Sequence, residues 1–172
     1  MRYRLALLAA AFTVVLLAIP PSATSMTPAA IGVGPNGYDF LIGTWSCRNS
    51  TPSTMEGPSK TTVTIARTAG GTLSVHVSAA NFDAMGYIVY AFETKTWWNP
   101  SMLADGGYGT ESSRQTGRKT MWTGSFTDPP SGKTVQVRDT YTFLNATTYT
   151  DLYQADVNGT WKVEGNSTCR RA

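Results

Sequence analysis

The residues whose chemistry could support a reaction are few in this chain. A catalytic triad needs a base placed to take a proton from a nucleophile, but the chain has one histidine, His76, and no Gly-x-Ser-x-Gly turn. The alternation in Leu73-Ser74-Val75-His76-Val77 predicts a strand with His76 on its polar side. We therefore expect no special task for His76, and a ligand-contacting or haem-binding role is the alternative.

Two carboxylates, Asp139 and Asp151, lie in neighbouring segments that predict a β-hairpin. A two-residue turn at Asn145-Ala146 would set Arg138 diagonally across from Asp151 as an ion pair. A three-residue turn would instead place both carboxylates on one face, as a polar anchor in a ligand pocket or as an acid/base pair. That face would also carry Tyr141, Phe143, Tyr149 and Tyr153. A slip of one residue in register moves every side chain to the other face, so both arrangements stay open.

Cys47 and Cys169 are the only two cysteines, and we expect them to form a disulfide. Their spacing is not that of a C-x-x-C redox motif. One histidine and a bridged cysteine pair leave only carboxylates as metal ligands, so we expect no metal and no cofactor.

Aromatic side chains concentrate in the middle of the chain. Adjacent Trp97 and Trp98 cannot both face inward on a regular strand, so one of them should lie at a bulge, a rim or the surface. The predicted ligand contacts are five of these aromatics and two residues of the hairpin: Tyr87, Trp97, Trp98, Tyr108, Trp122, Arg138 and Tyr153.

The elements that must position these residues are short strands rich in Val, Thr, Tyr, Trp and Phe, with no convincing helical period. Turn chemistry separates them, as at Ala69-Gly70-Gly71 and Val157-Asn158-Gly159. The predicted strands are 40–48, 60–67, 72–78, 85–93, 107–113, 119–127, 134–144, 147–154 and 160–169. This succession predicts an all-β, antiparallel up-and-down meander, closed into a barrel or folded into a sandwich.

The cysteines favour the barrel. A disulfide requires Cα atoms within roughly 7 Å, so the first and last strands must lie close together, as they do when a meander closes. Period-two alternation places Trp45 with Cys47 on the first strand, and Trp161, Val163 and Gly165 with Cys169 on the last. We expect these faces to point inward.

The segment Asp39-Phe40-Leu41-Ile42-Gly43-Thr44-Trp45, with its Gly-x-Trp on the opening strand, resembles the calycin superfamily of lipocalins, avidins and nitrobindin-like barrels. Together with Thr94-Lys95-Thr96-Trp97-Trp98, Gly106-Gly107-Tyr108, Ser131-Gly132-Lys133 and Val137-Arg138-Asp139, it is similar to an uncharacterised family of secreted bacterial lipocalin-like proteins. The likeness spans most of residues 39–171.

The resemblance implies an 8- to 10-stranded lipocalin-like barrel whose mouth admits a small apolar molecule. It also implies that Gly43 and Trp45 are structural, with Trp45 at the closed end beneath a basic side chain from Arg170 or Arg171. Nitrobindin-like barrels hold haem through a histidine near the C-terminal end, and residues 145–172 contain none. Haem chemistry is therefore disfavoured.

The first 25 residues predict an export signal, because Arg2 and Arg4 precede an apolar run from Leu5 to Ile19 that is shorter than a membrane-spanning helix. We place cleavage after Ser25, a leader at 26–38 and the barrel domain at 39–172. Export leads to the periplasm or the extracellular space. No later stretch is long and apolar enough to span a membrane.

Removing the signal takes away two of the 14 basic residues and none of the 11 acidic ones. The remaining net charge of +1 and the scattered lysines and arginines argue against a nucleic-acid partner. We expect an exported protein that binds a small hydrophobic or amphipathic molecule in its barrel. The alternatives are a haem-binding or carboxylate-based enzyme, and a packed barrel that acts as an envelope interaction or inhibitor protein.

Overall fold

The computed structural model describes residues 37–51, 57–114, 118–128 and 131–172. The predicted export signal and the leader up to residue 36 lie outside the described residues. The elements are a short 3-10 helix, η1 (Asp39–Leu41), and the strands β1 (Gly43–Asn49), β2 (Lys60–Arg67), β3 (Leu73–Ala79), β4 (Phe82–Ala91), β5 (Thr96–Leu103), β6 (Tyr108–Ser113), β7 (Lys119–Asp128), β8 (Lys133–Asn145), β9 (Thr148–Val157) and β10 (Thr160–Arg171).

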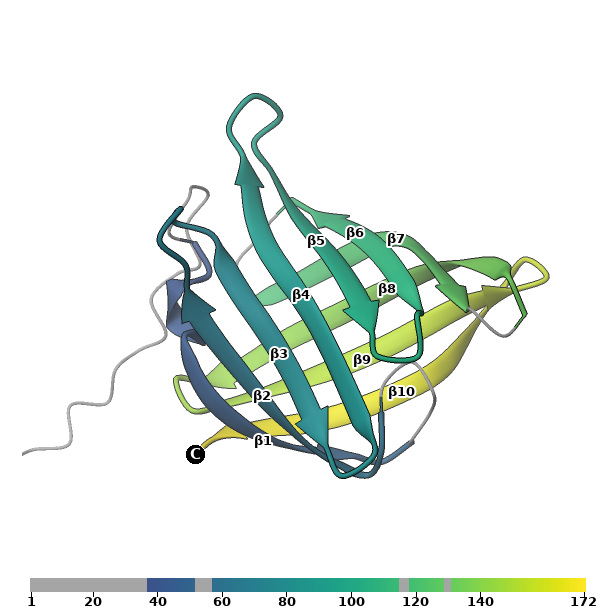
Figure 1. Ribbon diagram of the computed structural model, residues 1–172, viewed down its shortest axis with the longest axis horizontal. Coiled ribbons are helices and arrows are strands. Elements are labelled where there is room, and N and C mark those ends of the chain that lie inside the picture. The colour runs from purple at the N-terminus through teal and green to yellow at the C-terminus, as the bar shows by residue number, and fades with distance from the viewer. Residues whose placement is uncertain (1–36, 52–56, 115–117, 129–130) are drawn as a thin grey trace, which may run out of the picture.

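Each strand pairs antiparallel with the next along the chain, and β1 also pairs with β10, so the sheet closes into a ten-stranded barrel (Figure 1). This confirms the predicted all-β meander of 8 to 10 strands. Closure sets Cys47 directly opposite Cys169. The two residues form the predicted disulfide, with their Cα atoms 4.0 Å apart.

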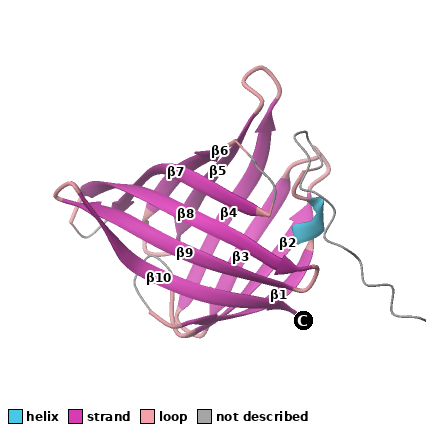
Figure 2. Ribbon diagram, turned by 180° about the vertical axis from the view of Figure 1, so that it is seen from behind, coloured by secondary structure: helices cyan, strands magenta, loops and turns pink. Residues whose placement is uncertain are grey.

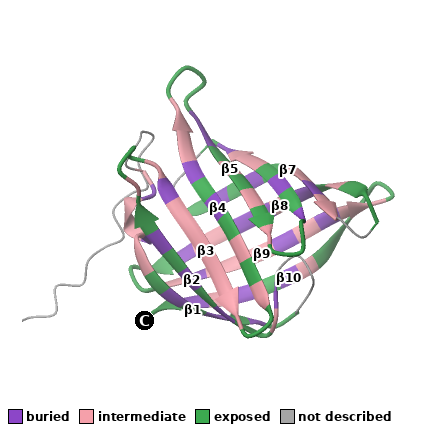
Figure 3. Cartoon of the chain, in the orientation of Figure 1, coloured by how far each residue is buried: buried purple, intermediate pink, exposed green. Residues whose placement is uncertain are grey.

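The strands follow the two-residue alternation of the sequence, which Figure 3 shows as alternating buried and exposed bands along β1 and β2. The turns use the residues that their geometry demands. Asn158 and Gly159 both have positive φ, 55° and 79°, which is the form of a tight hairpin turn between β9 and β10. Gly124 allows β6 and β7 to approach, because a Cβ atom there would lie 1.9 Å from the Thr110 carbonyl oxygen.

Strand β5 was not predicted, because Pro100 interrupts a segment that otherwise has strand composition. The structure accommodates this proline where the β4–β5 ladder is broken, since pairing passes from Gly86↔Ser101 directly to Val89↔Trp98. Pro100 therefore lies at a gap in the β4–β5 pairing, where a residue without a backbone N–H costs no ladder hydrogen bond to β4.

The predicted inward face of the last strand is wrong at its N-terminal half. A bulge between Val163 and Gly165 shifts the register against β9. Gly165 and Cys169 face inward as predicted, but Trp161 and Val163 lie on the outer surface and are exposed. A single extra residue reverses the inward–outward alternation of side chains on one side of the bulge. The period-two pattern of the sequence does not reveal where such a bulge lies.

Two clusters of buried side chains fill the two ends of the barrel. The larger lies at the end covered by η1, which Figure 2 shows in cyan beside the start of β1, and contains Tyr38, Leu41 and Trp45. The smaller contains Phe126, Val137, Tyr153 and Ala155. We call these the closed end and the far end. No helix in the described part of the chain is long and apolar enough to cross a membrane.

Candidate functional site

The closed end is plugged by Tyr38, which the sequence had assigned to the leader. Its ring lies 4.8 Å from the Trp97 ring and 5.4 Å from the Trp122 ring, centroid to centroid. Burial raises the pKa of the Tyr38 hydroxyl far above its ordinary value, although the side chains of Thr120, Ser113 and Trp122 oppose that shift. Tyr38 is therefore part of the barrel core, although the predicted leader ended at residue 38.

Arg171 fixes η1 to the barrel. Its guanidinium carbon lies 4.4 Å from the centroid of the Trp45 ring, and its two terminal nitrogens donate hydrogen bonds to the carbonyl oxygens of Ile42 (2.8 Å) and Phe40 (2.6 Å). Gly43 makes room for this contact, because it has a φ of 138° and a Cβ atom there would lie 2.6 Å from the Arg171 guanidinium. The Gly-x-Trp pattern thus has a structural cause in this chain.

The barrel interior contains a cavity of about 180 Å³, which is lined by side chains of both clusters. Its apolar wall is formed by side chains of β2, β3 and β4, which include Val63, Val75, Val77 and Ala84. Side chains from β6, β8 and β9 form a polar wall on the opposite side in the strand order. Val75, Val77 and Ala84 face inward and are nevertheless only partly buried, which shows that the cavity interrupts the core.

Three carboxyl groups lie on the polar wall: Glu111 on β6, Asp139 on β8 and Asp151 on β9. We call them the acidic cluster. Asp139 is only 5% exposed. Its pKa is raised, because desolvation disfavours the ionised form more strongly than hydrogen bonds with Asp151, Tyr141 and the Thr140 backbone favour it.

Tyr141 joins the three carboxyl groups. Its phenol lines the cavity, and enclosure in the barrel raises the pKa of its hydroxyl well above the ordinary value. Electrostatic repulsion from Asp139 and Asp151, and then from Tyr149 once it ionises and from Glu111, adds to the increase. Tyr141 therefore stays protonated and donates its hydroxyl to Asp139.

The structure resolves the alternative that the sequence left open for the β8–β9 hairpin. The turn residues are Ala146 and Thr147, and a register shift between Phe143 and Asn145 accompanies them. Asp139 then pairs with Tyr153 across the strands, and Tyr141 with Asp151. The arrangement that groups the carboxylates with the aromatic rings on one inner face is therefore the correct one.

The alternative ion pair between Arg138 and Asp151 is wrong. Arg138 points away from the cavity, where its Nε donates to the Gln154 side-chain oxygen at 2.8 Å. Its guanidinium carbon also lies 4.4 Å from the centroid of the Trp161 ring.

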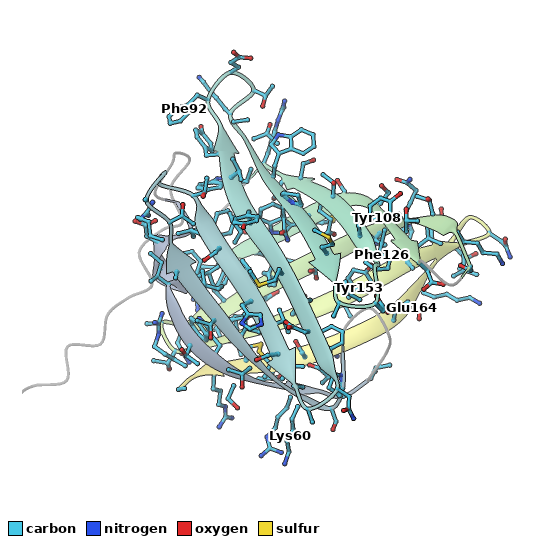
Figure 4. All side chains as sticks on the ribbon, in the orientation of Figure 1. Lys60, Phe92, Tyr108, Phe126, Tyr153 and Glu164 are labelled. Atoms are coloured by element: carbon cyan, nitrogen blue, oxygen red, sulfur yellow. A yellow bond between two sulfur atoms is a disulfide. The ribbon has the colours of Figure 1, made fainter. Side chains whose placement is uncertain are left out.

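The structure brings some of the predicted ligand contacts together and separates others. Trp122 and Tyr153 line the cavity, and Tyr153 lies beside Phe126 towards the far end (Figure 4). Trp97 is buried at the closed end (2% exposed) and Trp98 is 42% exposed, which confirms that the two neighbours face opposite ways. The remaining aromatic candidates, Tyr87 and Tyr108, are on the outer surface.

Sequence reasoning did not single out Glu111 or Tyr38. Glu111 occupies the same face of β6 as buried Gly109 and Ser113. The small residues two positions before and after Glu111 were the sequence feature that could have indicated an inward-facing carboxyl group. Tyr38 precedes the first element and carries no periodic signal.

His76 is on the outer face of β3. Its Nε2 lies 2.6 Å from the Asp83 carboxylate on β4, and both side chains are exposed. The imidazole therefore does not face the cavity. Among the described residues, no group of three or more His, Cys, Asp and Glu side chains has the arrangement of a metal site.

The outer surface of β4, β5 and β6 carries an apolar stripe. Met85 pairs with Met102, and Met102 pairs with Tyr108, and all three side chains are exposed. Tyr87 and Trp98 are exposed on the same strands. This stripe faces solvent, opposite in direction to the cavity.

No protein-family model and no curated protein matches this sequence.

Proposed function

We propose that this chain is an exported, lipocalin-like protein that holds one small hydrophobic or amphipathic molecule inside its barrel. The observation that carries the proposal is the cavity of about 180 Å³ in the barrel interior, lined by side chains of both buried clusters. A β-barrel interior of this kind is a usual place for a small ligand.

The size of the cavity favours a compact ligand. It is smaller than the roughly 300–1,000 Å³ typical of sites for drug-sized molecules, and slightly larger than an engineered cavity of about 150 Å³ that accepts benzene. A single ring with one short polar substituent matches this volume.

Two further observations support the lipocalin-like and exported character. The stacking of Arg171 on Trp45 at the closed end matches what the resemblance to lipocalins implies. The Cys47–Cys169 disulfide is consistent with an oxidising compartment outside the cytosol.

Native mass spectrometry of the protein isolated from its own cells and medium tests the proposal. We expect a second species, heavier than the bare chain by the mass of one small molecule, which disappears when the protein is denatured. A bare-chain mass, together with no mass increase after incubation with a panel of small ring compounds, would count against a binding function.

A catalytic role is the second candidate, because Asp139 and Asp151 share a hydrogen bond on the cavity wall and the pKa of Asp139 is raised. A carrier returns its ligand unchanged. An acid/base enzyme would convert the co-purifying molecule into a product of different mass, and the Asp139→Asn variant would lose that conversion.

A further inference from the structure

The charges on the cavity wall are one-sided. The ionisable side chains on the wall are those of the acidic cluster and of tyrosines, and among the described lining residues there is no lysine, arginine or histidine. Carboxylates removed from water are costly unless a positive charge or several hydrogen-bond donors accompany them. The described side chains and backbone groups of the barrel provide only part of that compensation.

Asp139 shows where the compensation is incomplete. It is 5% exposed and lines the cavity, yet its Oδ1 atom has no hydrogen-bond partner among the described residues. Its interactions are with Asp151, the Tyr141 hydroxyl and the Thr140 backbone N–H. A donor from inside the cavity would complete the set.

The rest of the cavity matches a cation with an apolar body. The aromatic rings of Trp122, Tyr141, Tyr149 and Tyr153 line it together with the acidic cluster, and an aromatic face attracts a cation. The apolar wall of β3 lies on the opposite side of the closed barrel from β8. A ligand with a charge at one end and a hydrocarbon ring at the other would satisfy both walls.

We propose that the ligand is a compact organic cation, a protonated amine on a single ring-sized apolar group, whose ammonium lies between Asp139 and Asp151 with Glu111 nearby. This inference rests on the proposed binding function and specifies the chemical class of the ligand. A neutral or anionic ring of the same size would occupy the cavity less well.

The proposal implies that binding releases a proton. Two carboxyl groups can share a hydrogen bond only while one of them is protonated, so the empty Asp139–Asp151 pair holds one proton. An incoming ammonium ion brings its own donors and favours two ionised carboxylates, and the displaced proton leaves to the buffer. The raised pKa of Asp139 agrees with a proton held in the empty state.

The titratable groups that surround this pair come from three strands. They are Glu111 on β6, Tyr141 on β8, and Tyr149 and Tyr153 on β9. Tyr141 stays protonated across the neutral range, because its pKa lies well above the ordinary value of about 10. Proton release should therefore come from the carboxyl groups.

The test compares three probes of matched size: benzylamine, benzyl alcohol and benzoate. Each is titrated calorimetrically into the whole protein near neutral pH, in two buffers with different ionisation enthalpies. We expect benzylamine to bind at least about tenfold more tightly than benzyl alcohol, since a charge-assisted hydrogen bond contributes more than a neutral one. We expect benzoate to bind most weakly. The enthalpy of benzylamine binding should differ between the buffers by the amount that proton release predicts.

Two variants locate the effect. Asp139→Asn and Asp151→Asn should each weaken benzylamine binding and abolish the buffer dependence. The double variant, Asp139→Asn with Asp151→Asn, should bring benzylamine affinity close to that of benzyl alcohol. Asp83→Asn is the matched control, because it removes one carboxylate from the outer face of β4. It should leave benzylamine affinity unchanged, and thermal melting checks that each variant is folded.

The outcomes separate the inference from the function on which it rests. If benzyl alcohol and benzylamine bind equally well, or benzoate binds best, the cation inference fails while the binding function stands. If none of the three probes binds, the cation inference fails, and the native mass spectrum of the isolated protein decides whether the binding function stands. A preference for benzylamine that is undiminished in Asp139→Asn and in Asp151→Asn would also overturn the assignment of the ammonium site.

Discussion

Asp139 keeps a carboxyl group at a position that is 5% exposed, where asparagine would have nearly the same shape without a charge to bury. Its carboxyl group faces the cavity beside Asp151 and Tyr141, and its ionised form is disfavoured there. A residue that destabilises the empty protein in this way is best explained by what the cavity binds.

The raised pKa of Asp139 gives a pH dependence with a defined sign. The unfolded carboxyl group ionises near pH 4, while the folded one retains its proton to higher pH, so the folded state binds more protons in that interval. The free energy of unfolding should therefore fall as the pH rises from about 4 towards the folded pKa. Urea unfolding across this range, without added ligand, should show the decline, and Asp139→Asn should reduce it. An equally steep decline in the variant would mean that another group is responsible.

Arg171 should contribute more to stability than its neighbour Arg170, although both are exposed near the C-terminal end of β10. Arg171→Met removes two charge-assisted hydrogen bonds to backbone carbonyls and the stacking on Trp45. We expect a loss of about 1–2 kcal/mol, because the site is exposed and the bonds partly solvated. Arg170→Met, the control, should change the free energy of unfolding by less than about 0.5 kcal/mol. Equal losses would show that η1 is not held by the Arg171 side chain.

At the scale of elements, nine of the ten strands could be predicted from composition and turn residues, and the predicted bounds of β2 agree with those observed. Strand β5 could not, because Pro100 is compatible with a strand only where the neighbouring ladder is already broken. The outward orientation of Trp161 could not be predicted either, because the bulge that turns this side chain outward depends on how β10 pairs with β9.

The candidate site was predictable as a set of residues but not as an arrangement. The sequence indicated that Asp139 and Asp151 would share a face with four aromatic residues if the hairpin had one register and not the other. The choice depended on the bulge near Leu144, which the hairpin sequence does not specify. Glu111 comes from β6, two strands away from β8, so the register of the two ladders through β7 decides whether it reaches the same wall.

The disulfide joins the two strands that close the barrel. In a double variant, Cys47→Ser with Cys169→Ser, we expect a loss of up to about 4–5 kcal/mol, because the bridge closes a sequence separation of 122 residues in the unfolded chain. The β1–β10 ladder remains in the variant, so the barrel should still form. Urea unfolding measures the loss, and circular dichroism checks the fold. A variant as stable as the original chain would show that the bridge adds nothing to closure.

At the scale of the whole molecule, the barrel presents different chemistry inside and outside. The inside is packed at both ends and open in the middle, with carboxyl groups on one wall. Outside, the hairpin between β4 and β5 extends beyond the barrel and carries Phe92, whose side chain is exposed (Figure 4). A barrel with a cavity of this kind suits the proposed role of a small-molecule carrier.

Export predicts a specific mature form. The protein isolated from outside the cytosol should begin after Ser25, the predicted cleavage position, and should carry no free thiol because Cys47 and Cys169 are bridged. Intact mass and N-terminal sequencing measure both properties. Recovery of the chain from the cytosol with its first 25 residues and two reduced cysteines would contradict the export proposal.

The central claim is that the barrel interior is the binding site, and filling that interior tests it most directly. Ala84→Phe places a ring in the cavity, and Ala66→Phe makes the same change on the exposed outer face of β2. Calorimetric titration with benzylamine and benzyl alcohol compares the two variants with the original chain, once thermal melting has shown that both are folded. We expect Ala84→Phe to lose binding of every probe that the original chain binds, whereas Ala66→Phe should retain it. Unchanged binding in folded Ala84→Phe would place the ligand elsewhere and contradict the account.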